Sequence, residues 1–216
     1  MLKSFIVYFT VGFIVLCLII SYNQRNSEMV FVKAGDGNEY TVRNLPDKQV
    51  AADTLAELRR RMELLVQQMS SNPDVQDEFC SLQIEQLKDR FKPDKICESP
   101  SDSKYTSYSV DKGAKIFVCL RNKQTGEIAD INTLTYVSIH ELSHVMSSEV
   151  GHTDQFWSNF KSLLRQAMAL DIYTYVDYSK SPMPYCGISI NSSAIDPATD
   201  NLQATLKTTN LTRSCR

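Results

Sequence analysis

Apolar residues recur at the three- and four-residue spacing of a helix in four segments of the chain. This spacing predicts helices over Asp47–Met69 and Asp77–Phe91, and Pro93 should close the second of them. It also predicts a helix around residues 134–146 and another over about residues 153–170. Each of these helices has one apolar side, which indicates that they pack around a common core.

Two pairs of short segments, rich in β-branched and aromatic residues, flank turn-forming residues and are typical of β-hairpins. The first pair is Met29–Lys33 and Glu39–Arg43, and the second is Tyr105–Val110 and Lys115–Leu120. Residues 92–104 between the helices and the second hairpin are polar and are predicted to form a loop. Helices and hairpins in this order predict an α+β fold.

The N-terminal part of the chain is strongly apolar. Residues 5–20 contain no charged side chain, and with their neighbours they approach the ~20 residues that span a bilayer. A cleaved signal peptide is the alternative, but the run is long and no pair of small residues marks a cleavage site after it. We therefore predict a single-pass transmembrane anchor over residues 1–22.

The rest of the 216-residue chain has a length that suits one globular domain. Residues 23–28 are interpreted as a linker, residues 29–197 as the domain and residues 198–216 as a weakly ordered tail. The net charge is −2, so nucleic acid is not favoured as a partner.

The chain has six cysteines, and Cys17 lies in the predicted anchor. The spacing of the others fits no zinc knuckle. Two interpretations stay open: Cys80 and Cys97 could form a disulfide in an oxidising compartment, or all of these cysteines could be buried thiols.

The candidate chemistry is concentrated in the predicted helix around residues 134–146 and just after it. His140, Glu141 and His144 form the pattern H-E-x-x-H, and His152 is the third histidine of a chain that has three. Residues four apart lie on one face of a helix, so His140 and His144 can bind the same Zn²⁺. Glu141 is placed beside them to take a proton from a water molecule at the metal.

A catalytic zinc needs a third protein ligand and one open position. Glu149 and His152 both follow the motif and are candidates for this ligand. We favour His152, because Gly151 can end the helix at positive φ and turn the chain back toward the metal. Asn132 or Thr133 is expected to cap the start of the same helix.

Apolar residues surround the motif, so its helix is expected to be buried. Imidazoles and a carboxylate that are buried without partners cost free energy, and a bound metal would offset that cost. These apolar neighbours are Leu134, Tyr136, Val137, Ile139, Leu142, Val145 and Met146.

The segment HELSHVMSSEVGHTDQFW resembles the motif of the WLM and SprT-like zinc metallopeptidases, in which G-H-x-x-x-F follows H-E-x-x-H. Gly151, His152 and Phe156 match the second part. The segments VRNLPDKQVAADTLAELRRRM and DYSKSPMPYCGISIN look like those of short membrane-anchored metallopeptidases of large DNA viruses. The resemblance implies a zincin-like α+β domain, of the minimal gluzincin or SprT-like type. It would hold two hairpins and about four helices after the transmembrane helix.

The resemblance also implies that His140, His144 and His152 bind Zn²⁺ and that Glu141 is the catalytic base. In zinc peptidases the strand before the metal helix bounds the cleft and can pair with an extended substrate. Lys115–Leu120 is therefore the candidate substrate-binding edge, and an ordinary core hairpin is the alternative.

A further candidate lies in the tyrosine-rich segment 171–190. Peptide hydrolysis needs a donor for the oxyanion of the tetrahedral intermediate, and Tyr185 is the candidate for this role. Packing in the core or in a loop is the alternative for Tyr185. Trp157 is expected in the core, and the run Arg59–Arg61 on a solvated face of its helix.

These features predict a membrane-anchored endopeptidase that hydrolyses peptide bonds with Zn²⁺ and Glu141. The expected partners are a protein or peptide substrate, the membrane through residues 4–22, and other virion proteins. The expected location is the virion membrane or the host endoplasmic reticulum membrane. A catalytically silent structural virion or membrane protein with a zinc-stabilised peptidase fold is the alternative function, and a secreted peptidase is a third.

Overall fold

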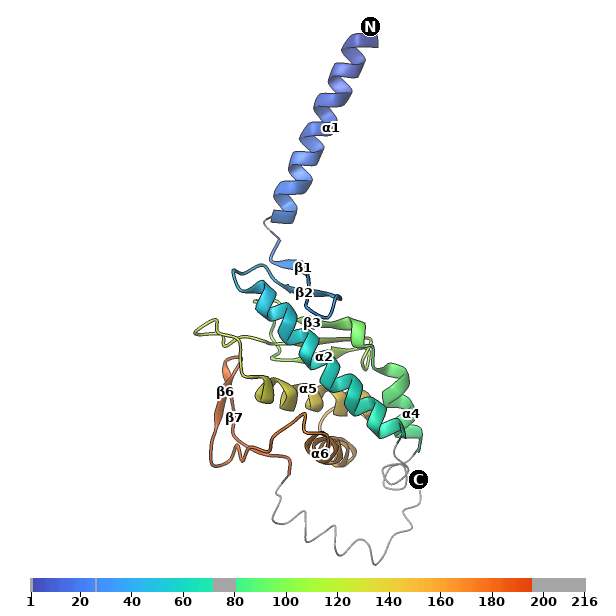
Figure 1. The fold of residues 1–216 in the computed structure, drawn as a ribbon, viewed down its shortest axis with the longest axis vertical. Coiled ribbons are helices and arrows are strands. Elements are labelled where there is room, and N and C mark those ends of the chain that lie inside the picture. The colour runs from blue at the N-terminus through green and yellow to red at the C-terminus, as the bar shows by residue number, and fades with distance from the viewer. Residues whose placement is uncertain (1, 26, 72–80, 196–216) are drawn as a thin grey trace, which may run out of the picture.

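The protein has an α+β fold, seen in a computed structural model that describes residues 2–25, 27–71 and 81–195 (Figure 1). Its helices and small sheets follow one another along the chain much as the hydrophobic pattern predicts. The α-helices are α1 (Leu2–Arg25), α2 (Lys48–Ser71), α4 (Ser81–Arg90), α5 (Ile131–Met146) and α6 (Asp154–Ala169), and Pro93–Lys95 forms a 3₁₀ turn.

The strands form three small sheets within the described residues. The first hairpin and the long helix after it have nearly the predicted bounds, because glycine turns and helical periodicity are strong local signals. The strands are β1 (Met29–Lys33) and β2 (Glu39–Arg43), β3 (Ile96–Glu98), β4 (Tyr108–Val110) and β5 (Lys115–Val118), and β6 (Met183–Tyr185) and β7 (Ile188–Ile190).

The middle sheet corrects two predictions. Its strand order is β3-β5-β4, with β3 parallel to β5 and β4 antiparallel to it. The strand β3 lies inside the segment 92–104 that was predicted to be a loop. Because β5 is paired on both sides, the segment Lys115–Leu120 is not an edge. The edge strands of this sheet are β3 and β4, and β4 is the one that lines the cavity described below.

A buried ion pair explains why β3 was missed. Glu98, at the end of β3, is 1% exposed, and one of its carboxylate oxygens accepts a hydrogen bond from Arg121 Nε at 2.8 Å. The other oxygen accepts the backbone N–H of Arg43 at 2.7 Å. Arg121 also pairs with Asp47, at the start of α2. A charged residue in a polar segment indicates a loop, unless its partner elsewhere in the chain is known.

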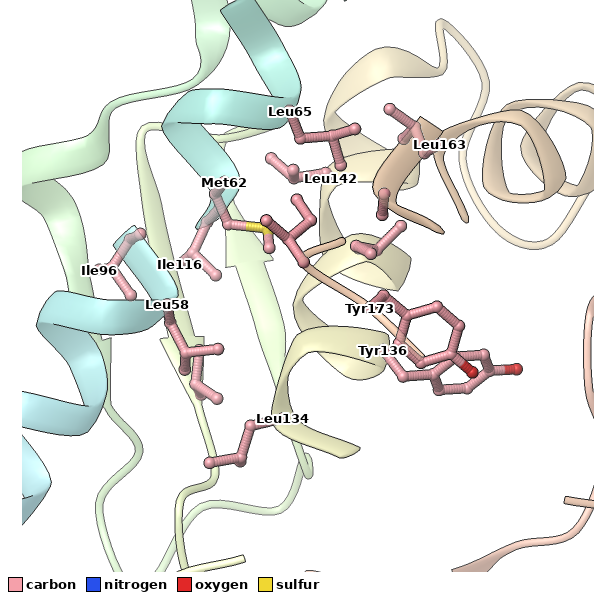
Figure 2. Close-up of a cluster of buried hydrophobic side chains, with 14 of the residues drawn as sticks. Leu58, Met62, Leu65, Ile96, Ile116, Leu134, Tyr136, Leu142, Leu163 and Tyr173 are labelled. Atoms are coloured by element: carbon pink, nitrogen blue, oxygen red, sulfur yellow. The ribbon is translucent and has the colours of Figure 1, made fainter. Parts of the chain in front are cut away.

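The core lies between α2 and the pair α5 and α6, with the middle sheet beside it (Figure 2). Leu58, Met62 and Leu65 of α2 face this core at helical spacing, as the sequence predicts. They meet Ile96 and Ile116 from the adjacent strands β3 and β5. The same core buries the apolar side of α5, so the helix of the H-E-x-x-H motif is held by packing.

One arginine of the predicted solvated face has a structural contact. Arg61 donates from Nη1 to Thr135 Oγ1 at 3.1 Å and to the carbonyl oxygen of Ile172 at 2.7 Å. It therefore ties α2 to α5 and to the segment after α6. Helical periodicity alone places Arg61 outside, because its partners lie far away in the sequence.

The helix predicted at the N-terminus is present as α1. Within the parts of the chain that the structure describes, none of the helices has both the length and the apolar character that crossing a membrane requires. The structure therefore shows a helix along the predicted anchor of residues 1–22 but does not identify it as a membrane span.

The disulfide joins Cys119 to Cys186 and not Cys80 to Cys97. Cys97 is a free, buried thiol, and Cys80 lies outside the described residues. Cys119 follows β5, and Cys186 begins the two-residue turn of the β6–β7 hairpin, with φ of 49° and Gly187 at 81°. The bridge thus fastens this hairpin to the middle sheet.

We predict that Cys186→Ser lowers the free energy of unfolding by about 2–4 kcal/mol, because the cross-link closes a long loop. Cys119→Ser should give a similar loss. Denaturant unfolding followed by circular dichroism measures this change. Cys17→Ser, at an exposed position on α1, is the control and should leave stability unchanged. Equal stability of all three variants would show that the bridge does not form.

Candidate metal centre

The helix of the motif starts at a well-defined cap. Asp130 is the N-cap of α5, and its Oδ1 accepts the backbone N–H of Thr133 at 2.9 Å. The predicted caps, Asn132 and Thr133, are inside the helix. Asn132 instead exchanges two 2.8 Å hydrogen bonds with the backbone of Thr174, which fixes the segment after α6 against α5.

The three histidines converge, as predicted. The rings of His140 and His144 lie one turn apart on α5 with centroids 5.0 Å apart, and His152 lies 4.9 Å from the first and 5.0 Å from the second. One nitrogen from each ring falls within 4.8 Å of the other two. Among the described residues, no fourth histidine, cysteine or carboxylate joins this group.

This arrangement fits a tetrahedral metal. Two ligands at the usual Zn–N distance of about 2.0–2.1 Å and the tetrahedral angle are about 3.3 Å apart. Nε2 of His140 and Nε2 of His152 are separated by 3.1 Å. The donor set of three imidazoles with one position left free is the set of a catalytic zinc site.

The loop that brings His152 back differs from the prediction in one respect. The helix ends at Met146, and Ser147 is extended, so Gly151 does not end it. Gly151 has a φ of 90° within the loop, where it allows the chain to turn before His152. The alternative ligand Glu149 lines the same cavity but does not join the three nitrogens.

Phe156 explains the last position of the G-H-x-x-x-F pattern. Its ring is fully buried, and its centroid lies 4.8, 4.4 and 4.6 Å from those of His140, His144 and His152. The ring stands on α6, whose N-cap is Thr153. One aromatic side chain therefore packs against all three candidate ligands and restricts their rotation.

Burial keeps the two helical histidines neutral. It lowers the pKa of His140 to about 3 and that of His144 to about 4, and the neighbouring imidazoles lower both further. Neutral imidazole is the form that binds a metal. Both side chains are therefore in the ligand form at pH 7.

Glu141 lies on the same helix and faces the same cavity. Burial raises its pKa to about 7, and a hydrogen bond from the backbone N–H of Ser109, on β4, opposes this rise. A carboxyl group with a pKa near neutrality can both accept and donate a proton at physiological pH.

Tyr185 lies at the same cavity, at the end of β6. Its hydroxyl forms a 2.7 Å hydrogen bond with Ser107 Oγ, which in turn accepts the backbone N–H of Cys119 at 3.0 Å. Burial, with a contribution from the charge of Glu141, raises the pKa of Tyr185. The hydroxyl therefore keeps its proton and can donate it in a hydrogen bond.

The cavity has a volume of about 730 Å³, in the range of ligand-binding pockets. Its floor is the polar side of α5, one wall is formed by residues 105–109 with the free side of β4, and the other by residues 188–192 around β7. Trp157, predicted in the core, is 40% exposed and lines this cavity. The second wall was missed, because hairpin β6–β7 lies in a proline- and serine-rich segment.

We predict that Glu141→Gln stabilises the metal-free protein in a pH-dependent way. The folded pKa of about 7 lies above the usual value of 4.5, so the carboxyl is neutral in both states below pH 4.5 and its ionisation costs no stability there. The cost then grows until about pH 7 and is complete above it. The free-energy gap between variant and wild type should rise over this window to on the order of 3 kcal/mol.

Denaturant unfolding in the presence of a chelator measures this gap at several pH values. The same substitution at the exposed Glu39 is the control and should give a small gap. A gap for Glu141→Gln that does not change with pH would contradict the buried position of its carboxyl.

Comparison with known proteins agrees with the geometry. Residues 83–213 match the model of the WLM domain. Protein R325 of Acanthamoeba polyphaga mimivirus is 38% identical over 173 residues, which cover 80% of this chain and 87% of that protein. Protein 136R of Invertebrate iridescent virus 6 is 39% identical over 69 residues, which cover 31% of this chain and 38% of that protein.

The crystal structure of Wss1 from Saccharomyces cerevisiae is similar over 58% of this chain and 83% of its own, with 18% identity and a TM-score of 0.44. The match to the WLM domain covers more than half of the chain and includes the H-E-x-x-H motif, the histidine loop and hairpin β6–β7. The similarity to protein R325 of the mimivirus extends over most of both chains. The chain therefore belongs to the WLM domain family.

Proposed function

We propose that the protein is a zinc-dependent endopeptidase. The observation that carries this proposal is the convergence of three imidazoles at an open cavity, with no fourth ligand among the described residues. A structural zinc is closed by four protein ligands, whereas a catalytic zinc keeps one position for water or substrate. The geometry thus supports the enzyme over the structural alternative.

In this proposal His140, His144 and His152 hold the metal. Zinc, when bound there, would polarise the scissile carbonyl and lower the pKa of nearby water. Phe156 keeps the three rings in place. The lowered pKa values of His140 and His144 spare these two side chains from releasing protons before the metal binds.

Glu141 is the proposed general base. Its pKa of about 7 lets it take a proton from a water molecule in the cavity and pass that proton to the leaving amine. The hydrogen bond from the backbone of Ser109 orients the carboxylate, and it also places the free side of β4 next to the reacting groups.

Tyr185 is the proposed donor to the oxyanion. Its raised pKa keeps the hydroxyl protonated, and the contact with Ser107 fixes the ring at the cavity. The disulfide at Cys186 holds the next residue of the chain, so the phenol is supported from two directions.

We also propose that the domain is attached to a membrane and faces an oxidising compartment. The large apolar side chains of α1 are exposed on all its sides, including Phe9, Phe13 and Leu18, as for a helix surrounded by lipid. A disulfide such as Cys119–Cys186 persists on the oxidising side of a membrane or in a virion. The virion membrane and the endoplasmic reticulum membrane of the host both meet this condition, and other virion proteins would be substrates or neighbours there.

We predict that Glu141→Gln keeps the zinc but lowers kcat for peptide hydrolysis by at least about 100-fold, because it removes the general base. His144→Ala should lose both zinc and activity. Elemental analysis of the full chain gives the zinc content, and digestion of a broad peptide library gives the activity.

Glu149→Gln is the matched control, since this carboxylate lines the cavity without joining the imidazoles. It should retain zinc and cleavage. Undiminished cleavage by Glu141→Gln would refute the proposed mechanism. Loss of zinc in Glu149→Gln would indicate that Glu149, and not His152, is the third ligand.

We predict that the full chain sediments with membranes and resists extraction by high salt, whereas residues 23–216 stay in the supernatant. The reason is the apolar surface of α1, which is unfavourable in water. Sequencing the amino terminus of the mature protein tests the secreted alternative. A full chain that is extracted completely would contradict membrane attachment.

A further inference from the structure

We infer that the cavity holds a subsite for a large apolar side chain of the substrate, formed by Val150, Trp157 and Ile188. This inference rests on the proposed peptidase function and names the substrate class of the same site. The substrate is an extended peptide segment with a residue such as leucine or methionine next to the cleaved bond.

The first observation is where the exposed apolar side chains gather. Outside α1, the described part of the chain exposes eight large hydrophobic residues, and four of them line this one cavity. An apolar patch that stays in contact with water is typical of a binding site. The eight are Phe31, Val50, Leu82, Tyr105, Val110, Val150, Trp157 and Ile188.

The second observation is the position of this patch beside the metal ligands. Val150 is 87% exposed and stands on the loop that carries His152. The ring of Trp157, on α6, lies 5.8 Å from the ring of His152. Ile188, on β7, is 54% exposed at the opposite wall. Three separate elements thus present apolar surface to the cavity that holds the proposed reaction centre.

The charges of the cavity do not favour an acidic side chain at this position. Lys112 is the lining residue with a basic side chain, apart from the histidines. Its Nζ contacts the carbonyl oxygens of Ser147 and Ser148 at the end of α5, so its charge is already engaged. Glu149 could attract a basic side chain instead, which the experiment below distinguishes.

The third observation is the free side of β4. An extended peptide can lie along this strand, because the sheet pairs β4 with β5 on its other side only. On the free side the backbone N–H of Ser109 already donates to Glu141. Alternate side chains of such a peptide point to the same face, so one of them can enter the apolar subsite while the backbone stays at the strand.

The experiment uses Trp157 as the probe, since it is the one tryptophan of the chain. The full chain with Glu141→Gln and bound zinc is titrated with peptides that differ only in the central residue: leucine, serine or lysine. Tryptophan fluorescence is followed at an excitation wavelength where tyrosine does not absorb. We expect the leucine peptide to bind at least about 10-fold more tightly than the other two.

Val150→Thr makes the subsite more polar at constant shape, Ile188→Thr makes it more polar and one carbon smaller, and both variants keep the probe. Each should weaken binding of the leucine peptide by about 3- to 10-fold and leave the serine peptide nearly unchanged. The matched controls are Val50→Thr on α2 and Leu82→Thr on α4, which are exposed apolar residues outside the cavity. They should bind the leucine peptide as the parent protein does.

Equal affinity for the three peptides, tighter binding of the lysine peptide, or equal effects of the subsite and control variants would overturn the inference. Failure of the proposed function gives a different result. Selective binding of the leucine peptide without cleavage by the wild-type protein would support the subsite and contradict the proposed peptidase function. Cleavage by the wild-type protein without selective binding of the leucine peptide would support the peptidase function and contradict the subsite.

Discussion

The site depends on one constraint: two partly buried imidazoles and a buried carboxylate lie on a helix whose other side belongs to the core, and a third, exposed imidazole lies beside them. Such groups are costly to bury in charged form. Burial therefore lowers the pKa values of His140 and His144, which are neutral at pH 7, and raises the pKa of Glu141. The three nitrogens converge, so a divalent cation can replace the water that they have lost. Burial and metal affinity therefore have the same structural origin.

The packing around the rings makes this arrangement rigid. Phe156 contacts all three imidazoles from α6, and the hydrophobic core holds α6 against α5. A ligand histidine on a loop, such as His152, would otherwise lose much conformational entropy when the metal binds. The phenylalanine of the G-H-x-x-x-F pattern thus has a physical role, which is to preorganise the ligands rather than to contact the metal.

Much of the fold and of the candidate site can be predicted from local signals in the sequence. The i, i+4 spacing of His140 and His144 and the periodicity of the helices depend on neighbours along the chain, and these predictions are confirmed. The strand β3, the contacts of Arg61 and the disulfide partner of Cys119 depend on residues far away in the sequence. Each was missed for that reason, and the true N-cap, Asp130, was missed by two residues.

These non-local contacts also decide the shape of the cavity. Pairing with β3 makes β5 a central strand and leaves β4 as the border of the site. The disulfide of Cys119 fixes hairpin β6–β7 on the opposite wall, and Ser107 connects both walls through Tyr185. The candidate metal ligands could therefore be identified from one short motif, whereas the proposed substrate selectivity would be set by two walls that meet only in the folded chain. A protein with the same motif and a different pairing of these strands would keep the metal site and bind other peptides.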